Sequence, residues 1–371
     1  MKKDLVILGA GPRGLSVAIQ ALKYKDRLNI YLIDPRPIST WEEPHMVPNM
    51  MMRSPITFDL VTFQKDLQEY SLSNFLRFNL PYYPSQAQVE LNEQFCSRKE
   101  FVDYLKFCLN KLIEEGVTLI NKPPSLITKD KVILPSTTIN YHSLVIATGK
   151  YTEEIVVPNY LNKDSIYICK DIYCSDWYKK NVYIIGSGQF SAELVDYVTD
   201  NYRASIKWVR THNIKVEQYP VPSYKNWGKL TALGLHYKNN LSLETNRKSY
   251  LKKVKSWGPT ITPHINKSLK DKKHKFKIIN PEEIKLSKDN VYILASGRKP
   301  NLYKLPFDFR FTSGLLKENT AKLNNNFSAV GHPNIYFTGL LALEAGGPCQ
   351  GSIISSGNTS KTILDSVVSF L

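Results

Sequence analysis

The sequence lacks the patterns that usually carry metal, thiol or acyl-transfer chemistry. Its five cysteines are scattered, and no two of them form a Cys-x-x-C pair. An odd, scattered set argues against a disulfide framework and against a closely spaced redox pair. No His-Glu-x-x-His segment, cysteine–histidine zinc spacing or Gly-x-Ser-x-Gly elbow occurs either. We therefore expect no bound metal and no acyl-transfer chemistry.

Long apolar runs are also missing. No stretch approaches the roughly 20 apolar residues that a membrane-spanning helix needs. The short run Leu5–Leu8 follows two lysines, as in a secretion signal, but it leads directly into a glycine-rich segment and therefore predicts a first strand. A hydrophobic content of 42% is typical of a globular protein. We expect a cytoplasmic protein without a membrane span.

Acidic residues are fewer than basic ones, since 33 Asp and Glu stand against 49 Lys and Arg and leave a net charge of +16. The excess is concentrated between Lys238 and Lys277. Nucleic acid or an anionic membrane could bind such a surface. Because no nucleic-acid-binding motif or interleaved aromatic platform accompanies it, we interpret the stretch as a solvated helical face and loop that also attract anionic cofactors. We expect no nucleic-acid partner.

The chain contains two glycine-rich segments of the kind that bind dinucleotides, which we call fingerprints. The first directly follows the run Leu5–Leu8. Its residues are Gly9, Gly11, Pro12, Arg13 and Gly14. Glycine lets the backbone approach a diphosphate, and the N–H groups at the following helix start attract its charge. Asp34 lies 20 residues after the last of these glycines, where a carboxylate accepts hydrogen bonds from an adenosine ribose. The pattern predicts a dinucleotide site.

The second fingerprint follows the apolar run Val182–Ile185 and contains Gly186, Gly188 and Gln189. After the strand expected next stands Arg210 rather than a carboxylate. A cation there suits the additional phosphate of NADPH, whereas the ribose of NADH prefers an acid. The alternative is that Arg210 only ends a strand in a basic protein. Two dinucleotide sites in one chain indicate electron transfer from one dinucleotide to the other.

The order of the expected elements predicts an α/β fold with two Rossmann-like dinucleotide-binding domains. Strands expected at 141–149 and 291–297 end in Ala147, Thr148 and Gly149 and in a similar Ala-Ser-Gly. Helices are expected at 100–115 and 355–371, and a strand at 334–338 leads to Gly339 and Leu340. We predict a discontinuous first domain, residues 1–158 and 300–371, with the second domain, residues 159–299, inserted in it.

Several segments resemble, in the right order, the flavin-dependent N-hydroxylating monooxygenases, which are the ornithine and lysine hydroxylases of siderophore pathways. They are Trp41–Met46 (similar to W-H-x-G-M), Asp59–Thr62 (D-L-V-T), Ser71–Leu76 (S-F-L-N-Y-L), Arg98–Tyr104 (R-R-E-F-x-D-Y) and Gly186–Glu193 (G-S-G-Q-S-A-A-E). The resemblance implies FAD at the first fingerprint, with Trp41 in its site and Gly339 and Leu340 around the flavin, and NADPH at the second. It also implies that one oxygen of O2 passes, through a flavin C4a-hydroperoxide, to a small amine or other nucleophile, as in a biosynthetic N-hydroxylation.

Two positions depart from that family. Counted back from Asp59, its flavin-side glutamine falls on Arg53 and its active-site lysine on Phe58. With Met52, these residues are our candidates for the catalytic wall beside the flavin. Arg53 could bind a substrate carboxylate, or it is a surface or FAD-phosphate arginine, and the methionine run 50–52 could equally be core filler. We expect a substrate with an anionic group, other than free ornithine or lysine.

Two other classes of function stay open at the level of the sequence. An FAD-dependent NAD(P)H oxidase or reductase would use the same sites without inserting oxygen into a substrate. A non-catalytic dinucleotide-binding sensor, or a nucleic-acid-associated protein, would use them without turnover. The sequence also leaves the number of subunits open, a homo-oligomer included.

Overall fold

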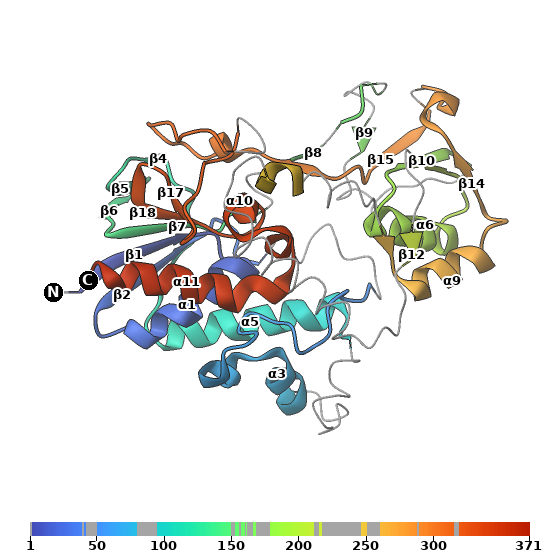
Figure 1. Ribbon diagram of the computed structural model, residues 1–371. Coiled ribbons are helices and arrows are strands. Elements are labelled where there is room, and N and C mark those ends of the chain that lie inside the picture. Colours follow the sequence, from blue (N-terminus) through green and yellow to red (C-terminus); the bar gives the residue numbers. More distant parts are fainter. Residues whose placement is uncertain are drawn as a thin grey trace.

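The computed structural model describes residues 2–38, 41, 50–79, 95–149, 153–155, 157–159, 161, 166–167, 179–210, 215–216, 246–250, 260–287, 289–314 and 319–371. Within them the chain forms two separate, mainly parallel sheets with helices packed against them, so the fold class is α/β (Figure 1). Residues 238–245 and 251–259 of the basic stretch between Lys238 and Lys277, and residues 42–49 after Trp41, lie outside the described residues.

The first sheet has six strands in the order β17-β18-β7-β1-β2-β3. Their bounds are β1 Lys3–Leu8, β2 Leu28–Ile33, β3 Thr118–Ile120, β7 Ser143–Ile146, β17 Ser328–Ala329 and β18 His332–Phe337. Strands from β18 to β3 are parallel, and β17 runs antiparallel to β18. β1 and β7 are buried almost throughout, as expected for central strands covered on both faces.

Helices α1 (Pro12–Ala21), α5 (Arg98–Glu114) and α11 (Ser356–Ser369) pack side by side on this sheet (Figure 1). The predicted helix at 100–115 is confirmed, but it begins at Arg98 because the Ser97 side chain and Glu100 form a capping box. Shorter elements nearby are the 3-10 helices Leu22–Tyr24 and Lys65–Tyr70, helix α3 (Leu72–Asn79) and helix α10 (Leu343–Gly346). The strand predicted at 141–149 is shorter, because the backbone turns after β7 and Gly149 has a φ of 47°.

A three-stranded antiparallel sheet follows β3, with β4 Leu126–Ile127, β5 Lys131–Leu134 and β6 Thr137–Asn140. The sequence prediction did not include it. Its strands are two to four residues long, too short to show a clear hydrophobic period.

The second sheet has five parallel strands in the order β14-β11-β10-β15-β9. Their bounds are β9 Ile166–Tyr167, β10 Asn181–Ile185, β11 Ser205–Val209, β14 Phe276–Ile279 and β15 Val291–Leu294. Helices α6 (Gln189–Asn201) and α9 (Pro263–Asp271) pack against each other beside it. A further pair of short parallel strands consists of β12 (Lys215–Val216) and β13 (Thr260–Ile261).

The chain passes between the two sheets at β8 (Glu153–Ile155) and returns at β16 (Arg298–Pro300). These two strands pair antiparallel with each other, and Figure 1 shows β8 between the two sheets. The domain boundaries predicted at 158/159 and 299/300 lie beside this pair, and the division into domains stays a proposal.

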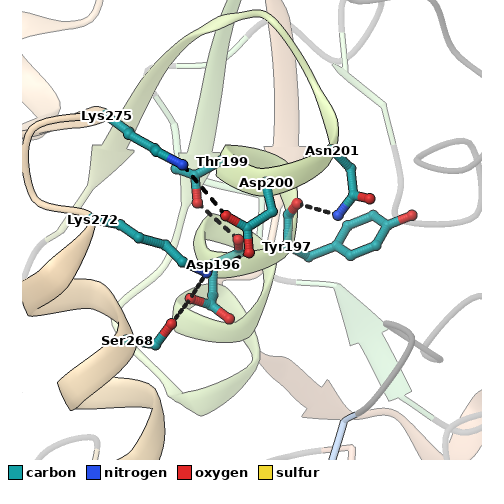
Figure 2. Close-up of polar contacts among 8 residues, drawn as sticks. All are labelled: Asp196, Tyr197, Thr199, Asp200, Asn201, Ser268, Lys272 and Lys275. Carbon is teal, nitrogen blue, oxygen red and sulfur yellow. Dashed lines mark hydrogen bonds and ion pairs between the residues drawn. The ribbon is translucent and has the colours of Figure 1, made fainter.

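Part of the basic stretch is neutralised by carboxylates of α6 (Figure 2). Lys272 lies 2.7 Å from Asp196 Oδ1 and 2.5 Å from Asp200 Oδ2, and Lys275 lies 3.6 Å from Asp200 Oδ1. Ser268 of α9 donates a hydrogen bond to Asp196. Partly exposed ion pairs contribute only about 0–1 kcal/mol each, and these pairs join the end of α9 to α6.

A buried carboxylate joins segments that are distant in sequence. Asp59 is 2% exposed, and its two oxygens accept the N–H groups of Val61 and of Leu72, each at 2.8 Å. Leu72 is the first residue of α3, so Asp59 fixes that helix start. Burial raises the pKa of Asp59 to about 7, while these hydrogen bonds act in the opposite direction.

The Tyr104 hydroxyl extends this polar core from α5. It donates a hydrogen bond to the Tyr70 carbonyl at 2.8 Å and accepts one from the Leu60 N–H at 3.3 Å. These hydrogen bonds therefore bring together three of the segments that resemble the hydroxylases, at 59–62, 71–76 and 98–104.

We expect Asp59→Asn to destabilise the protein in a pH-dependent way. Asparagine replaces one oxygen by an NH2 group, which cannot accept a hydrogen bond from a buried N–H, at a cost of about 1–3 kcal/mol. Because the folded pKa of Asp59 is raised, its contribution is complete below an unfolded pKa of about 4 and is lost as the pH rises toward 7. The difference in unfolding free energy between wild type and variant should therefore narrow from about pH 4 to pH 7 in urea titrations. Exposed Asp26→Asn is the control, and a pH-independent difference would contradict the assignment.

Candidate active site

A cleft of about 260 Å³ opens where β1, β2 and β7 end. The residues predicted to bind the first dinucleotide that line it are Gly9, Gly11, Pro12, Arg13, Asp34, Trp41, Thr148, Gly149, Gly339 and Leu340. The carboxyl ends of parallel strands are the usual position of ligands in open α/β sheets. Gly14 is the one predicted residue of this set that does not line the cleft.

The three glycines of the first fingerprint serve different needs. Gly9 has a φ of 105°, and a Cβ there would lie 2.6 Å from the Ala147 carbonyl oxygen. A Cβ on Gly14 would lie 1.8 Å from the Gly9 oxygen, so this glycine lets α1 pack against the strand end. Gly11, the N-cap of α1, has no heavy atom within 4 Å of such a Cβ. The space in front of Gly11 is therefore open to a ligand.

Asp34 directly follows β2, the strand next to β1, and lies beside the loop of the first fingerprint. Its Oδ2 accepts the Ala10 N–H at 2.7 Å and its Oδ1 accepts the Arg36 N–H at 2.9 Å. The carboxylate therefore holds the fingerprint loop against β2 and still faces the cleft. Each oxygen keeps a further lone pair for a ligand hydroxyl.

The far wall of the cleft comes from the C-terminal part of the chain. The Thr338 N–H donates to the Ile146 carbonyl at 3.2 Å, and Gly339 turns with a φ of 69°. Residues 350–353 also line the cleft, although the sequence prediction did not assign them to a site. Gly351 and Ser352 were the available signal, since such residues often form loops that approach a ligand closely.

Trp41 forms a side wall. Its ring centroid lies 5.3 Å from that of Phe101 on α5, and the Arg98 guanidinium lies 5.6 Å from the indole centroid. The start of α5 therefore positions this indole. The residues that follow it up to Met46, which carry the resemblance to W-H-x-G-M, lie outside the described residues.

The second fingerprint repeats the geometry of the first. Gly186 has a φ of 149°, and a Cβ there would lie 2.2 Å from the Ala295 carbonyl oxygen. Gly9 lies similarly close against the carbonyl oxygen of Ala147, where a Cβ would approach to 2.6 Å. Gly188 is the N-cap of α6 and, like Gly11, has no heavy atom within 4 Å of a Cβ. The second sheet thus offers a second open helix N-terminus of the kind that binds a diphosphate.

Gln189 and Arg210 lie beside this second helix start in different roles. The Gln189 side chain is buried and bonded to protein groups, donating to Glu193 at 2.7 Å and accepting the Thr262 N–H at 2.7 Å. It therefore ties α6 to the start of α9. Arg210 follows β11, with its guanidinium 5.0 Å from the centroid of the Trp208 ring. Its Nε is buried without a hydrogen-bond partner, and desolvation lowers its pKa.

The three predicted catalytic residues lie outside the first cleft. Met52 is half-buried, and its N–H donates to the Cys96 carbonyl at 2.8 Å. Phe58 is half-buried in a turn closed by its N–H and the Pro55 carbonyl. Arg53 is exposed. None of the three lines the cleft around Gly11, and their catalytic roles stay a prediction.

The described residues contain no group of three His, Cys, Asp or Glu side chains placed to hold a metal ion. In the same ranges, no helix combines the length and the apolar composition needed to cross a bilayer.

Each of the two large sheets carries a glycine fingerprint with open space at its N-cap glycine, Gly11 or Gly188. The fold therefore defines a protein with two dinucleotide sites. A family model described as L-lysine 6-monooxygenase/L-ornithine 5-monooxygenase matches residues 2–219. The chain belongs to this family, and it is therefore an oxidoreductase of the flavin monooxygenase class. The family and fold class predicted from the sequence are confirmed. A search of curated protein sequences finds no match to the chain.

Solved structures of the same fold span the whole chain. An ornithine N-hydroxylase from Kutzneria sp. 744, solved with reduced FAD, NADP+ and L-ornithine, is 16% identical with a TM-score of 0.76 and full coverage of both chains. A cadaverine monooxygenase from Erwinia amylovora, solved with FAD, is 16% identical with a TM-score of 0.76, covering 100% of this chain and 95% of its own. L-lysine 6-monooxygenase from Pseudomonas syringae is 15% identical with a TM-score of 0.75, and 99% of each chain is covered.

We expect Gly14→Ala to destabilise the protein far more than Gly11→Ala. At Gly14 the new methyl group would overlap the Gly9 oxygen, so we expect a loss of at least about 2 kcal/mol even though alanine favours a helix. At Gly11 the methyl group meets nothing and the φ of −83° suits alanine, so the loss should be limited to the roughly 1 kcal/mol by which alanine is a poorer N-cap than glycine. Urea unfolding of both variants checks this, and equal losses would contradict the packing role of Gly14.

Proposed function

We propose that the protein is an FAD-dependent, NADPH-using monooxygenase that transfers one oxygen atom of O2 to a small amine, by N-hydroxylation in a biosynthetic pathway. The observation that carries the proposal is the repeated geometry of the two fingerprints, each with an open N-cap glycine at Gly11 or Gly188. Family membership supports the reaction class, and the ornithine, lysine and cadaverine enzymes of the same fold support an amine substrate.

The first cleft fits FAD. The open space at Gly11 and the N–H groups of the α1 start suit a diphosphate, and Asp34 is placed to accept hydroxyl groups of the adenosine ribose. Leu340 and Ile353 give the remaining wall an apolar surface that excludes water. FAD, when bound, supplies electron transfer to O2 and the transfer of oxygen to the substrate.

The second fingerprint fits NADPH. Gly188 and the α6 start suit its diphosphate, while Arg210 after β11 supplies a cation for the additional phosphate. Trp208 holds the guanidinium in place, and the unpartnered Nε leaves a donor for that phosphate.

The substrate is a small amine that must react in its neutral form. An amine with a pKa of about 10.4 in water loses its proton more readily when it is bound in an apolar pocket that excludes water. We propose further that the substrate carries an anionic group, which pairs with Arg53.

We also propose a cytoplasmic location, the two-domain division at 158/159 and 299/300, and a homo-oligomer as one option for the assembly.

Reduction and product analysis test the proposal against the oxidase alternative. The purified protein should be yellow, and anaerobic NADPH should bleach it. On admission of air with simple amines, diamines and carboxylated amines, one of them should yield a hydroxylated product in proportion to the NADPH consumed. Gly11→Val is the matched control, because its branched side chain fills the open space and should prevent FAD retention. A colourless wild type, or no bleaching, would contradict the proposal, and H2O2 as the product with every amine would favour the oxidase.

We expect Arg210→Ala to raise the KM for NADPH by about tenfold or more and to leave the KM for NADH nearly unchanged. The reason is that only NADPH carries the phosphate that this guanidinium would bind, and a charged hydrogen bond contributes about 1.5–3 kcal/mol. Steady-state kinetics with both cofactors checks the expectation. Equal losses with NADPH and NADH would show instead that Arg210 only supports the end of β11.

A further inference from the structure

Arg13 connects the start of α1 to the C-terminal wall of the first cleft. Its Nη2 donates to the Gln350 carbonyl at 2.8 Å, to the Ser352 carbonyl at 2.5 Å and to Ser355 Oγ at 2.9 Å. These acceptors lie more than 330 residues away in sequence. One guanidinium nitrogen therefore holds the loop 350–355, which forms one side of the cleft.

The charge of this guanidinium has no counter-ion in the described residues. All three acceptors of Nη2 are neutral, and Nη1 is buried with no hydrogen-bond partner. Desolvation lowers the pKa of Arg13 to about 10, and the smaller opposing effect comes from the nearby Cys349. A buried cation without a partner is costly, so this position suits an anion that enters from outside the protein.

The surroundings of Arg13 suit an anion as well. The side chain belongs to the first turn of α1, where the helix dipole is positive, and it lines the same cleft as Gly11, whose front is open. A guanidinium has five N–H donors in a fixed planar fork, so it can hold the loop through one nitrogen and bind an oxyanion through another.

We propose that Arg13 couples cofactor binding to the position of the loop 350–355: Nη1 binds an anionic group of the dinucleotide while Nη2 holds the loop closed over the cleft. The anionic group is either a phosphate oxygen of the diphosphate or the anionic ring of reduced flavin. This inference rests on the proposed FAD site. Arg13 is a positioning residue for the loop and a charge partner for the cofactor.

Hydrogen exchange on the wild-type protein tests the coupling without a substitution. The amides of residues 350–355 are followed in protein freed of cofactor, with ADP added as a diphosphate without flavin, and with FAD oxidised or reduced. Slower exchange with ADP would assign the contact to the diphosphate. Slower exchange only with reduced FAD would assign it to the ring. If FAD binds and exchange at 350–355 is unchanged in every state, the coupling is overturned.

Substitution tests the charge. We expect Arg13→Gln to weaken FAD binding roughly tenfold or more, measured by titration of the apoprotein, because glutamine keeps hydrogen bonds but removes the cation. Arg13→Lys should recover part of the FAD affinity yet leave residues 350–355 exchanging faster, since lysine keeps the charge without the planar fork. Arg27→Gln, which removes an exposed cation at the opposite end of β1 and β2 from the cleft, is the control and should bind FAD as the wild type does.

Two results separate the inference from the proposed function. Arg13→Gln with wild-type affinity for FAD and for ADP, and only a lower thermal stability, would make Arg13 a structural clamp and overturn the inference while the FAD site stands. A wild type that binds no FAD would overturn the proposed function itself. If Arg13→Gln does not fold, the exchange experiment on the wild type still decides.

Discussion

Both nucleotide sites depend on one backbone contact, in which a glycine after one strand lies against the carbonyl of an alanine after the neighbouring strand. Gly9 meets Ala147 in this way, and Gly186 meets Ala295. Any side chain on either glycine would overlap that oxygen, so the close approach is available to glycine alone. It lets the chain leave the central strand and enter the helix at once, which puts an open helix N-terminus at the edge of each sheet.

The sequence was sufficient for the features that depend on local patterns. The apolar runs, the fingerprints and Asp34 predicted β1, β10 and the starts of α1 and α6, and ten of the residues that line the first cleft were among the predicted site residues. Residues 350–353 were not assigned to it, because their position depends on a contact between Arg13 and a loop at the other end of the chain. The small sheet of β4, β5 and β6 was also missed, since strands this short carry almost no periodic signal.

The segments that resemble the hydroxylases have a physical explanation that does not involve a substrate. Asp59 at the start of one segment caps α3 in the next, and Tyr104 in a third bonds the backbone between them. A buried carboxylate and a buried hydroxyl are costly unless every partner is in place, so these segments depend on one another. Arg53 precedes these segments and is exposed, so it is not part of this buried network.

The antiparallel pair of β8 and β16 has a consequence for how such a chain can change over evolutionary time. The strand that leaves the first sheet and the strand that returns to it are neighbours, hydrogen-bonded at residues 153–155 and 298–300. The segment between these two strands is therefore an insertion that begins and ends at neighbouring positions. A longer, shorter or exchanged inserted segment leaves the strand order of the six-stranded sheet unchanged, so the part with the second fingerprint can diverge separately from the part that holds the first cleft.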